Sequence, residues 1–194
     1  KISTLLVYLF LICNSILVLG PVIWTIMASF KKGNNLFSST FSGIEFTFDH
    51  YITLFTDTPY MQWYLNTFIL ATANMLISLI VVTMTAYVFS RYRFRGKRNT
   101  LMSILVLQMF PAFLSMTAIY ILLSKANLID TYTGLLLVYV TGSLPFMTWL
   151  VKGYFDAIPT SLDEAAKIDG AGHLTIFIQI ILPLAKPILV FVGL

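Results

Sequence analysis

The carboxylates of the segment 152–187 are the residues best placed to do chemistry. Asp163, Glu164 and Asp169 lie within seven positions of one another. Two such carboxylates can serve as general acid and general base, but no Ser/His/Asp set and no metal-ligand cluster accompanies them. We therefore expect them to cap a helix and to contact a partner, with no catalytic residue and no metal site. The chain also has no phosphate-binding glycine loop, so we expect it not to hydrolyse ATP by itself.

A short helix is predicted over residues 162–169 of this segment. Ser161 and Glu164 have the S-x-x-E spacing of a capping box, in which each side chain accepts a free backbone N–H of the other residue. The carboxylates of Asp163 and Glu164 are expected in the first turn, where they favour the positive end of the helix dipole. Gly170 is expected to leave the helix in the left-handed conformation.

A second short helix is expected from about residue 172 to 181, followed by Pro183 and Pro187. The segment thus predicts two helices with an elbow between them. Two adjacent small residues, Ala165 and Ala166, give the first helix a low surface that a partner can approach closely. Such a helix either lies on a bilayer or docks into another protein, and the pattern alone leaves both open.

The composition is that of a protein that crosses a membrane several times. Of the 194 residues, 58% are hydrophobic and only 10% are charged, whereas a soluble domain has about 25% charged residues. Four stretches without Asp, Glu, Lys or Arg are long enough to cross the hydrocarbon core, which needs roughly 20 residues. We expect an all-α bundle with complete spans at Leu5–Ser29, Leu65–Ser90, Thr100–Leu123 and Thr133–Val151.

A fifth apolar run starts near Ile176 and stops at Leu194. Because the chain also begins with Lys1 rather than Met, we expect it to be a fragment of a longer protein. Five cations follow the second span: Arg91, Arg93, Arg95, Lys97 and Arg98. The positive-inside rule places that link, and with it the region from Lys152 onward, in the cytoplasm. Since two spans flank these cations, we expect them not to bind nucleic acid.

A specific pattern covers twenty residues of the cytoplasmic segment. Its fixed positions are Glu164, Ala165, Ala166, Gly170, Ile180, Leu182 and Pro183. At every position and spacing this pattern resembles the EAA loop of ABC importer permeases. The flanking residues 168–171 and 182–187 look like the carbohydrate-uptake branch of that family, particularly the maltose/maltodextrin permeases of the MalG kind. The segments 87–96, 108–111 and 150–159 are similar to the same branch.

This resemblance implies the MetI-like ABC permease fold with six spans, of which the chain would hold four and part of a fifth. A first transmembrane helix and an extracellular loop, residues 1–63, would precede a permease core, residues 64–194, with the EAA loop at 152–187. The implied partners are a second, MalF-like permease, two ABC ATPase subunits and an extracellular sugar-binding protein. The implied location is the bacterial cytoplasmic membrane. ATP and Mg would bind to the ATPases, and no cofactor to this chain.

In that family the first short helix of the EAA loop sits in a groove of the ATPase. Carried over to this sequence, the contact and the elbow would be formed by Glu164, Ala165, Ala166, Asp169 and Gly170. The implied activity is oligosaccharide import, with maltodextrin as the first expectation.

The residues that line a sugar path are harder to predict. Hydrogen-bonding and aromatic side chains in or beside the spans are the candidates, namely Asn74, Gln108, Tyr120, Tyr139 and Trp149. Each of them can equally join helices or mark a membrane interface. Pro111 and Pro145 predict helix kinks. An ion-coupled secondary transporter is the alternative function, but such proteins usually hold ionisable residues within their spans, and the four complete spans contain none.

Overall fold

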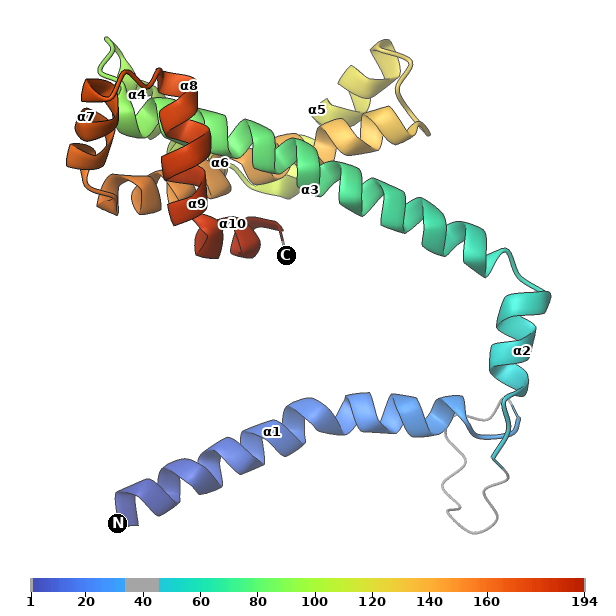
Figure 1. The fold of residues 1–194 in the computed structure, drawn as a ribbon. Coiled ribbons are helices and arrows are strands. Elements are labelled where there is room, and N and C mark those ends of the chain that lie inside the picture. Colours follow the sequence, from blue (N-terminus) through green and yellow to red (C-terminus); the bar gives the residue numbers. More distant parts are fainter. Residues whose placement is uncertain (1, 34–45, 194) are drawn as a thin grey trace. The chain divides into compact units, whose positions relative to one another are not determined.

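The computed structural model describes residues 2–33 and 46–193, and helices make up most of them. Two compact units divide the chain, Lys1–Leu65 and Asn66–Leu194. The ribbon in Figure 1 shows the helices in sequence order. The expectation of an all-α, membrane-type helical protein is confirmed.

The first unit contains one long apolar helix, α1 (Ile2–Ser29). Its residues 4–29 are apolar on every side and exposed, as expected for a helix that faces lipid. After it, Lys31 forms an isolated bridge with Phe46, and the short helix α2 (Asp49–Thr56) follows. The hydroxyls of Ser29 and Tyr51 are 2.7 Å apart, which attaches α2 to the end of α1.

Two further helices are long and apolar enough to cross a membrane, α3 (Tyr60–Arg91) and α6 (Tyr132–Ala157). They contain the predicted second and fourth spans and extend beyond them at both ends. Pro145 lies inside α6, and the helix continues through it. Before α6, the side chain of Thr131 accepts a hydrogen bond from the N–H of Gly134 and caps the helix.

The predicted third span is not one continuous helix. It is divided into α4 (Lys97–Gln108) and α5 (Ala112–Lys125), whose axes differ by 103°. The break falls at Met109–Pro111, because proline has no N–H to continue the helical ladder and disfavours a helical conformation in the residue before it. The kink expected at Pro111 is therefore a full interruption. The two helices together are still long and apolar enough to count as one bent span, so the expected span over Thr100–Leu123 is interrupted at Pro111.

The C-terminal part consists of short helical segments. They are α7 (Thr160–Ile168), α8 (His173–Ile176), the π-helical η1 (Phe177–Ile181), α9 (Leu182–Leu184) and α10 (Lys186–Gly193). The π turn immediately precedes Pro183, which has no N–H to donate. In this wider turn the N–H of Leu182 donates to the carbonyl of Phe177, five residues back.

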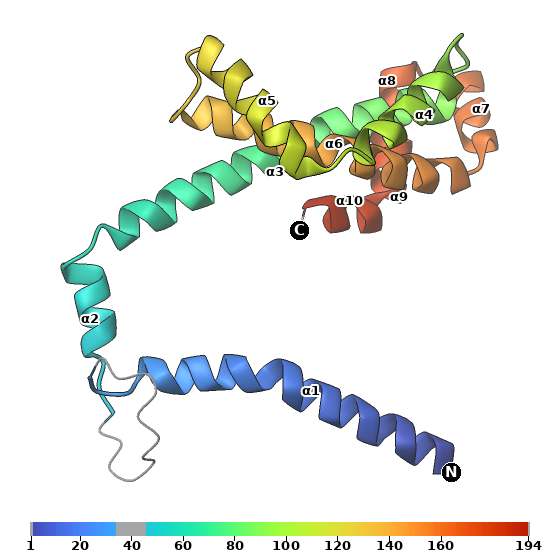
Figure 2. The ribbon, with the colours of Figure 1, turned by 180° about the vertical axis from the view of Figure 1, so that it is seen from behind.

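A buried core lies where α3, α6 and the α8–η1 segment meet. Its fully buried large side chains are Val82, Val151, Phe155, Ile176 and Ile181. The ring of Tyr87 packs on Phe177 with centroids 4.8 Å apart, and its hydroxyl donates to the carbonyl of His173. Figures 1 and 2 both show α7 and α8 beside the Arg91 end of α3. The EAA loop therefore supplies part of this core itself, which fixes the loop to α3 and α6.

Candidate functional site

One buried ion pair attaches α7 to the helices of the bundle. Arg91, the last residue of α3, places its Nε 2.7 Å from Oδ2 of Asp163, and the two side chains are only 7% and 9% exposed. The Arg91 Nε and the Asp163 Oδ1 are both buried without a hydrogen-bond partner. Charge attraction rather than an aligned hydrogen bond therefore holds the pair, and breaking it would leave a buried charge uncompensated.

The same guanidinium also holds the end of α6. Its two terminal nitrogens donate to the carbonyls of Phe155 and Ile158, each at 3.0 Å. Carbonyls in the last turn of a helix have no partner within the helix, so a cationic side chain satisfies and stabilises them. Arg91 thus joins three elements, α3, α6 and α7. We call Arg91, Asp163 and these two carbonyls the Arg91 clamp.

Three further contacts support the clamp. The hydroxyl of Ser90 donates to Oδ1 of Asp156 at 2.7 Å, and Lys152 forms an ion pair with the same carboxylate one turn earlier on α6. The ring of Tyr92 lies against His173, with centroids 5.2 Å apart. These contacts place the basic link and the EAA loop at the same end of the bundle, in agreement with the expectation that both lie on one side of the membrane.

The residues of the EAA motif divide between two faces of α7. The inner face carries Asp163, which is buried, and Ala166, which packs against the core. The outer face carries Ser161, Glu164, Ala165 and Ile168, all of which are exposed. Ile168 is 87% exposed, which is unusual for a large apolar side chain. The two adjacent alanines therefore do not share one surface: Ala165 faces outward and Ala166 faces the chain's own core.

The elbow after α7 has the predicted conformation. Asp169 ends the helix, and Gly170 has φ +83°, in the left-handed region that favours glycine. A Cβ added at Gly170 would meet no atom within 4 Å, so only the backbone conformation requires glycine there. The second half of the motif faces the opposite way, because Ile180 and Leu182 pack against the core while Pro183 is exposed.

The predicted capping box is wrong. α7 begins at Thr160 with Pro159 at the N-cap position, and no side chain caps its backbone N–H groups. Proline suits the start of a helix because its fixed φ agrees with the helical value. Ser161 therefore lies inside the first turn, and Asp163 forms a buried ion pair instead of only facing the helix dipole.

The candidates for a sugar path lie on four helices. Asn74 is half-buried in α3 and is 3.5 Å from the hydroxyl of Ser78. Trp149 is half-buried in α6 and donates to the carbonyl of Leu101, close to the basic link. Three candidates are exposed, namely Gln108 at the end of α4, Tyr120 in α5 and Tyr139 in α6. Their role in transport stays a prediction.

Sequence reasoning missed Arg91 as an individual residue, because it was one of five cations in a loop. A signal for it existed in the helical spacing. Thr83 and Tyr87 are buried, and Arg91 follows them at four-residue intervals on the same face of α3. A cation that continues a buried stripe is expected to point toward a buried partner.

Comparison with known proteins places the chain in a family. The family model described as "Binding-protein-dependent transport system inner membrane component" matches residues 80–193. The chain is 44% identical to the maltodextrin transport system permease protein MdxG of Bacillus subtilis, over 94% of this chain and 66% of the relative. It is 43% identical to the galactooligosaccharides transport system permease protein GanQ of the same organism, over 99% of this chain and 69% of the relative.

A solved structure gives the same result for the fold. A bacterial ABC transporter involved in the import of the acidic polysaccharide alginate superposes with a TM-score of 0.81 at 26% identity, covering 99% of this chain and 68% of that one. The chain therefore spans about two thirds of the length of the relatives that it matches. The resemblance carried by the EAA motif is confirmed: this chain belongs to the family of binding-protein-dependent transport system inner membrane components.

Proposed function

We propose that the chain is the permease subunit of an ABC importer for oligosaccharides, with maltodextrin as the first candidate substrate. The names of its relatives support a sugar as cargo, since they include a maltodextrin and a galactooligosaccharide permease. Its partners would be a second permease, two ATPase subunits that bind ATP and Mg, and an extracellular sugar-binding protein. The chain itself would catalyse no reaction and would bind no cofactor.

The observation that carries this proposal is the division of α7 into a clamped face and an exposed face. Asp163 on the inner face is held by Arg91, which also holds the last turn of α6. The outer face, with Ala165 and Ile168, is available to a partner. A force applied to the outer face would therefore reach α3 and α6 through the Arg91 clamp.

Energy coupling then takes a physical form. ATP-driven closure of the two ATPases would draw the two permease elbows together and tilt the bundles toward an outward-open state. Hydrolysis would release them. The chain contributes a preference for one conformation in each nucleotide state, and no bond needs to form or break on it.

A hollow of about 230 Å³ beside α7 suits a partner side chain. Charges of both signs surround it, from Arg93, Lys167 and Glu164 among others. The Asp163 Oδ1 belongs to a residue that lines this hollow and has no hydrogen-bond partner. Because this oxygen is buried, the polar partners that the hollow offers to a side chain of the ATPase are its exposed charged residues, Arg93, Glu164 and Lys167.

Protection of a single cysteine tests the docking face. In a full-length protein whose native cysteines, Cys13 among them, are replaced by serine, an Ala165→Cys variant would be labelled with a maleimide, with and without the partner ATPase. We expect the ATPase to slow labelling at position 165 severalfold and to leave a Ser124→Cys control, at the far end of α5, unchanged. Equal labelling rates at position 165 in both conditions would contradict docking at α7.

Uptake into proteoliposomes tests the activity and the cargo. The complete importer would be supplied with labelled maltodextrin or galactooligosaccharide, with internal ATP or with an imposed proton or sodium gradient. We expect uptake to need ATP and the binding protein, and maltodextrin to be taken up faster. Uptake driven by an ion gradient without ATP would support the secondary-transporter alternative instead.

A further inference from the structure

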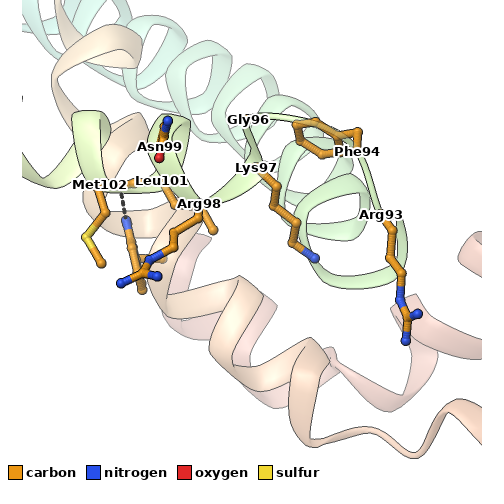
Figure 3. Close-up of a pocket in the computed structure, with 9 residues that line it drawn as sticks. Arg93, Phe94, Gly96, Lys97, Arg98, Asn99, Leu101 and Met102 are labelled. Atoms are coloured by element: carbon orange, nitrogen blue, oxygen red, sulfur yellow. Dashed lines mark hydrogen bonds between the residues drawn. The ribbon is translucent and has the colours of Figure 1, made fainter.

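The basic link between α3 and α4 encloses a cavity that the proposed coupling does not use. It has a volume of about 500 Å³ and opens to the surface. Its lining includes the cations Arg93, Lys97 and Arg98, and no acidic residue is among the residues that line it. Figure 3 shows the side chains of Arg93 and Lys97 at one end of the link and that of Arg98 turned toward Met102 at the other, so the cations line different parts of the cavity wall. A cavity lined by positive charges of this kind favours the binding of an anion.

These cations have little of their charge compensated by the protein. Lys97 donates one hydrogen bond to the carbonyl of Tyr92, which leaves two of its three ammonium donors. Neither Arg93 nor Arg98 forms an ion pair or hydrogen bond within the described residues 2–33 and 46–193. This differs from Arg91 two positions earlier, whose charge is used in the clamp.

The other part of the cavity is apolar. Phe94, Leu101, Met102 and the indole of Trp149 form that part of the lining. Trp149 is fixed there, because its Nε1 donates to the carbonyl of Leu101 at 3.3 Å. A soluble anion would leave these side chains without a partner, whereas a phospholipid presents a phosphate followed by glycerol and acyl chains. The lining therefore matches the order of groups along a lipid.

The position of the cavity agrees with a lipid ligand. α3 ends at Arg91 and α4 begins at Lys97, so the link joins two apolar helices at the end where each leaves the hydrocarbon region. Basic pockets at the cytoplasmic ends of transmembrane helices bind anionic lipid head groups. Tryptophan is also enriched at the level of the head groups.

We propose that this cavity binds the phosphate head group of an anionic phospholipid, with Arg93, Lys97 and Arg98 supplying the positive charge along its wall and Trp149 contacting the glycerol and the first acyl carbons. The cavity is distinct from the hollow beside α7, but Arg93 lines both, so Arg98→Gln is the variant that tests the lipid site alone. The proposal does not depend on which sugar is transported or on how α7 meets the ATPase.

Lipid binding to the purified full-length protein tests this site. The protein would be titrated in nanodiscs or mixed micelles with phosphatidylglycerol or phosphatidylcholine, and bound lipid would be counted by native mass spectrometry. We expect phosphatidylglycerol to be retained preferentially. Arg93→Gln and Arg98→Gln should each weaken its retention about fivefold, since each cation near the membrane surface contributes about 1 kcal/mol.

Arg95→Gln is the matched control, because it removes the same charge from the same link at a position that does not line the cavity. We expect this variant to bind phosphatidylglycerol like the unchanged protein. Equal losses in all three variants would overturn the site and indicate a diffuse effect of net charge. Displacement of the lipid by millimolar inorganic phosphate would also overturn it, since it would indicate a site for a soluble anion.

Discussion

The inner and outer faces of α7 differ in nearly every physical respect, although they belong to one helix of nine residues. The inner face is dry, charged and fixed: Asp163 is 6% exposed and paired with Arg91. The outer face is exposed to solvent and mixed in character, with the polar Ser161 and Glu164 beside Ala165 and Ile168. The difference teaches that substitutions on the inner face should act on stability, and substitutions on the outer face on association.

The largest effect is expected from Arg91→Leu. This change leaves Asp163 buried without a counter-charge and removes the donors to the carbonyls of Phe155 and Ile158. Removing one partner of a buried pair costs about 3–5 kcal/mol. Thermal unfolding of the full-length protein in mild detergent measures this loss. Arg95→Leu, on the exposed part of the same link, is the control and should change stability by no more than about 0.5 kcal/mol.

A double variant sharpens this result. Asp163→Leu together with Arg91→Leu removes both charges, so the combined loss should be smaller than the sum of the two single losses, by about 0.5–3 kcal/mol. Full recovery is not expected, because the carbonyl of Ile158 would still lack the Arg91 donor, while that of Phe155 keeps only the N–H of Ile158. Strictly additive losses would show that the two side chains do not act as a pair.

Gly170→Val should have the next largest effect, and it should act on coupling. A residue with a Cβ in the left-handed region costs about 1–2 kcal/mol, and the strain would be relieved by changing the elbow. We expect ATP hydrolysis to continue while sugar uptake falls. Gly172→Val is the matched control, since Gly172 has φ −76° and open space around it. Normal uptake by the Gly170 variant would contradict a need for the left-handed elbow.

Ile168→Glu should change association without changing stability. If Ile168 is covered by the proposed ATPase partner, burying a carboxylate in its place should weaken the complex by about tenfold, or about 1.4 kcal/mol. The midpoint of thermal unfolding should stay within the range of a surface substitution. Co-purification with the ATPase measures the first effect. Ile52→Glu, an exposed apolar position on α2, is the control and should leave association intact.

Ser161→Ala should have the smallest effect. If Ser161 capped α7, its loss would cost about 1 kcal/mol. Because no side chain caps α7, we expect a change of a few tenths of a kcal/mol in the free energy of unfolding. Thr131→Ala gives the scale, since Thr131 does cap α6 and its loss should cost about 1 kcal/mol. Equal losses of stability in the two variants would indicate that Ser161 does cap α7.

Sequence reasoning succeeded where one local property decides the structure. The absence of charge over more than twenty residues predicts a span, and α1, α3 and α6 agree with it. A glycine after a helix predicts a left-handed exit, and Gly170 has one. The motif at 164–183 indicated the family because it depends only on which residues stand at fixed spacings along the sequence.

Sequence reasoning failed where contacts between residues distant in the sequence decide the structure. The pair of Arg91 and Asp163 joins residues 72 positions apart, which no local pattern shows. The capping box was wrong because Pro159 and Ser161 both suit the start of a helix, and the sequence does not show which of them is used. The ion pair of Asp163 with Arg91 fixes which side of α7 faces the bundle, and α7 starts after Pro159. Pro111 did indicate a disturbance of the helix. Whether a proline bends a helix or ends it depends on the packing around it, so the sequence predicted a kink where the structure has the end of α4.

The Arg91 clamp also makes α3 a lever. The clamp lies at one extreme of the helix, and the part of α3 in the second unit, residues 66–91, is about 39 Å long at 1.5 Å per residue. For a straight rod of that length, each degree of tilt about the clamp moves the opposite end by about 0.7 Å. A tilt of α3 by a few degrees about the clamp is therefore amplified into a displacement as large as an atom at the opposite end of the helix.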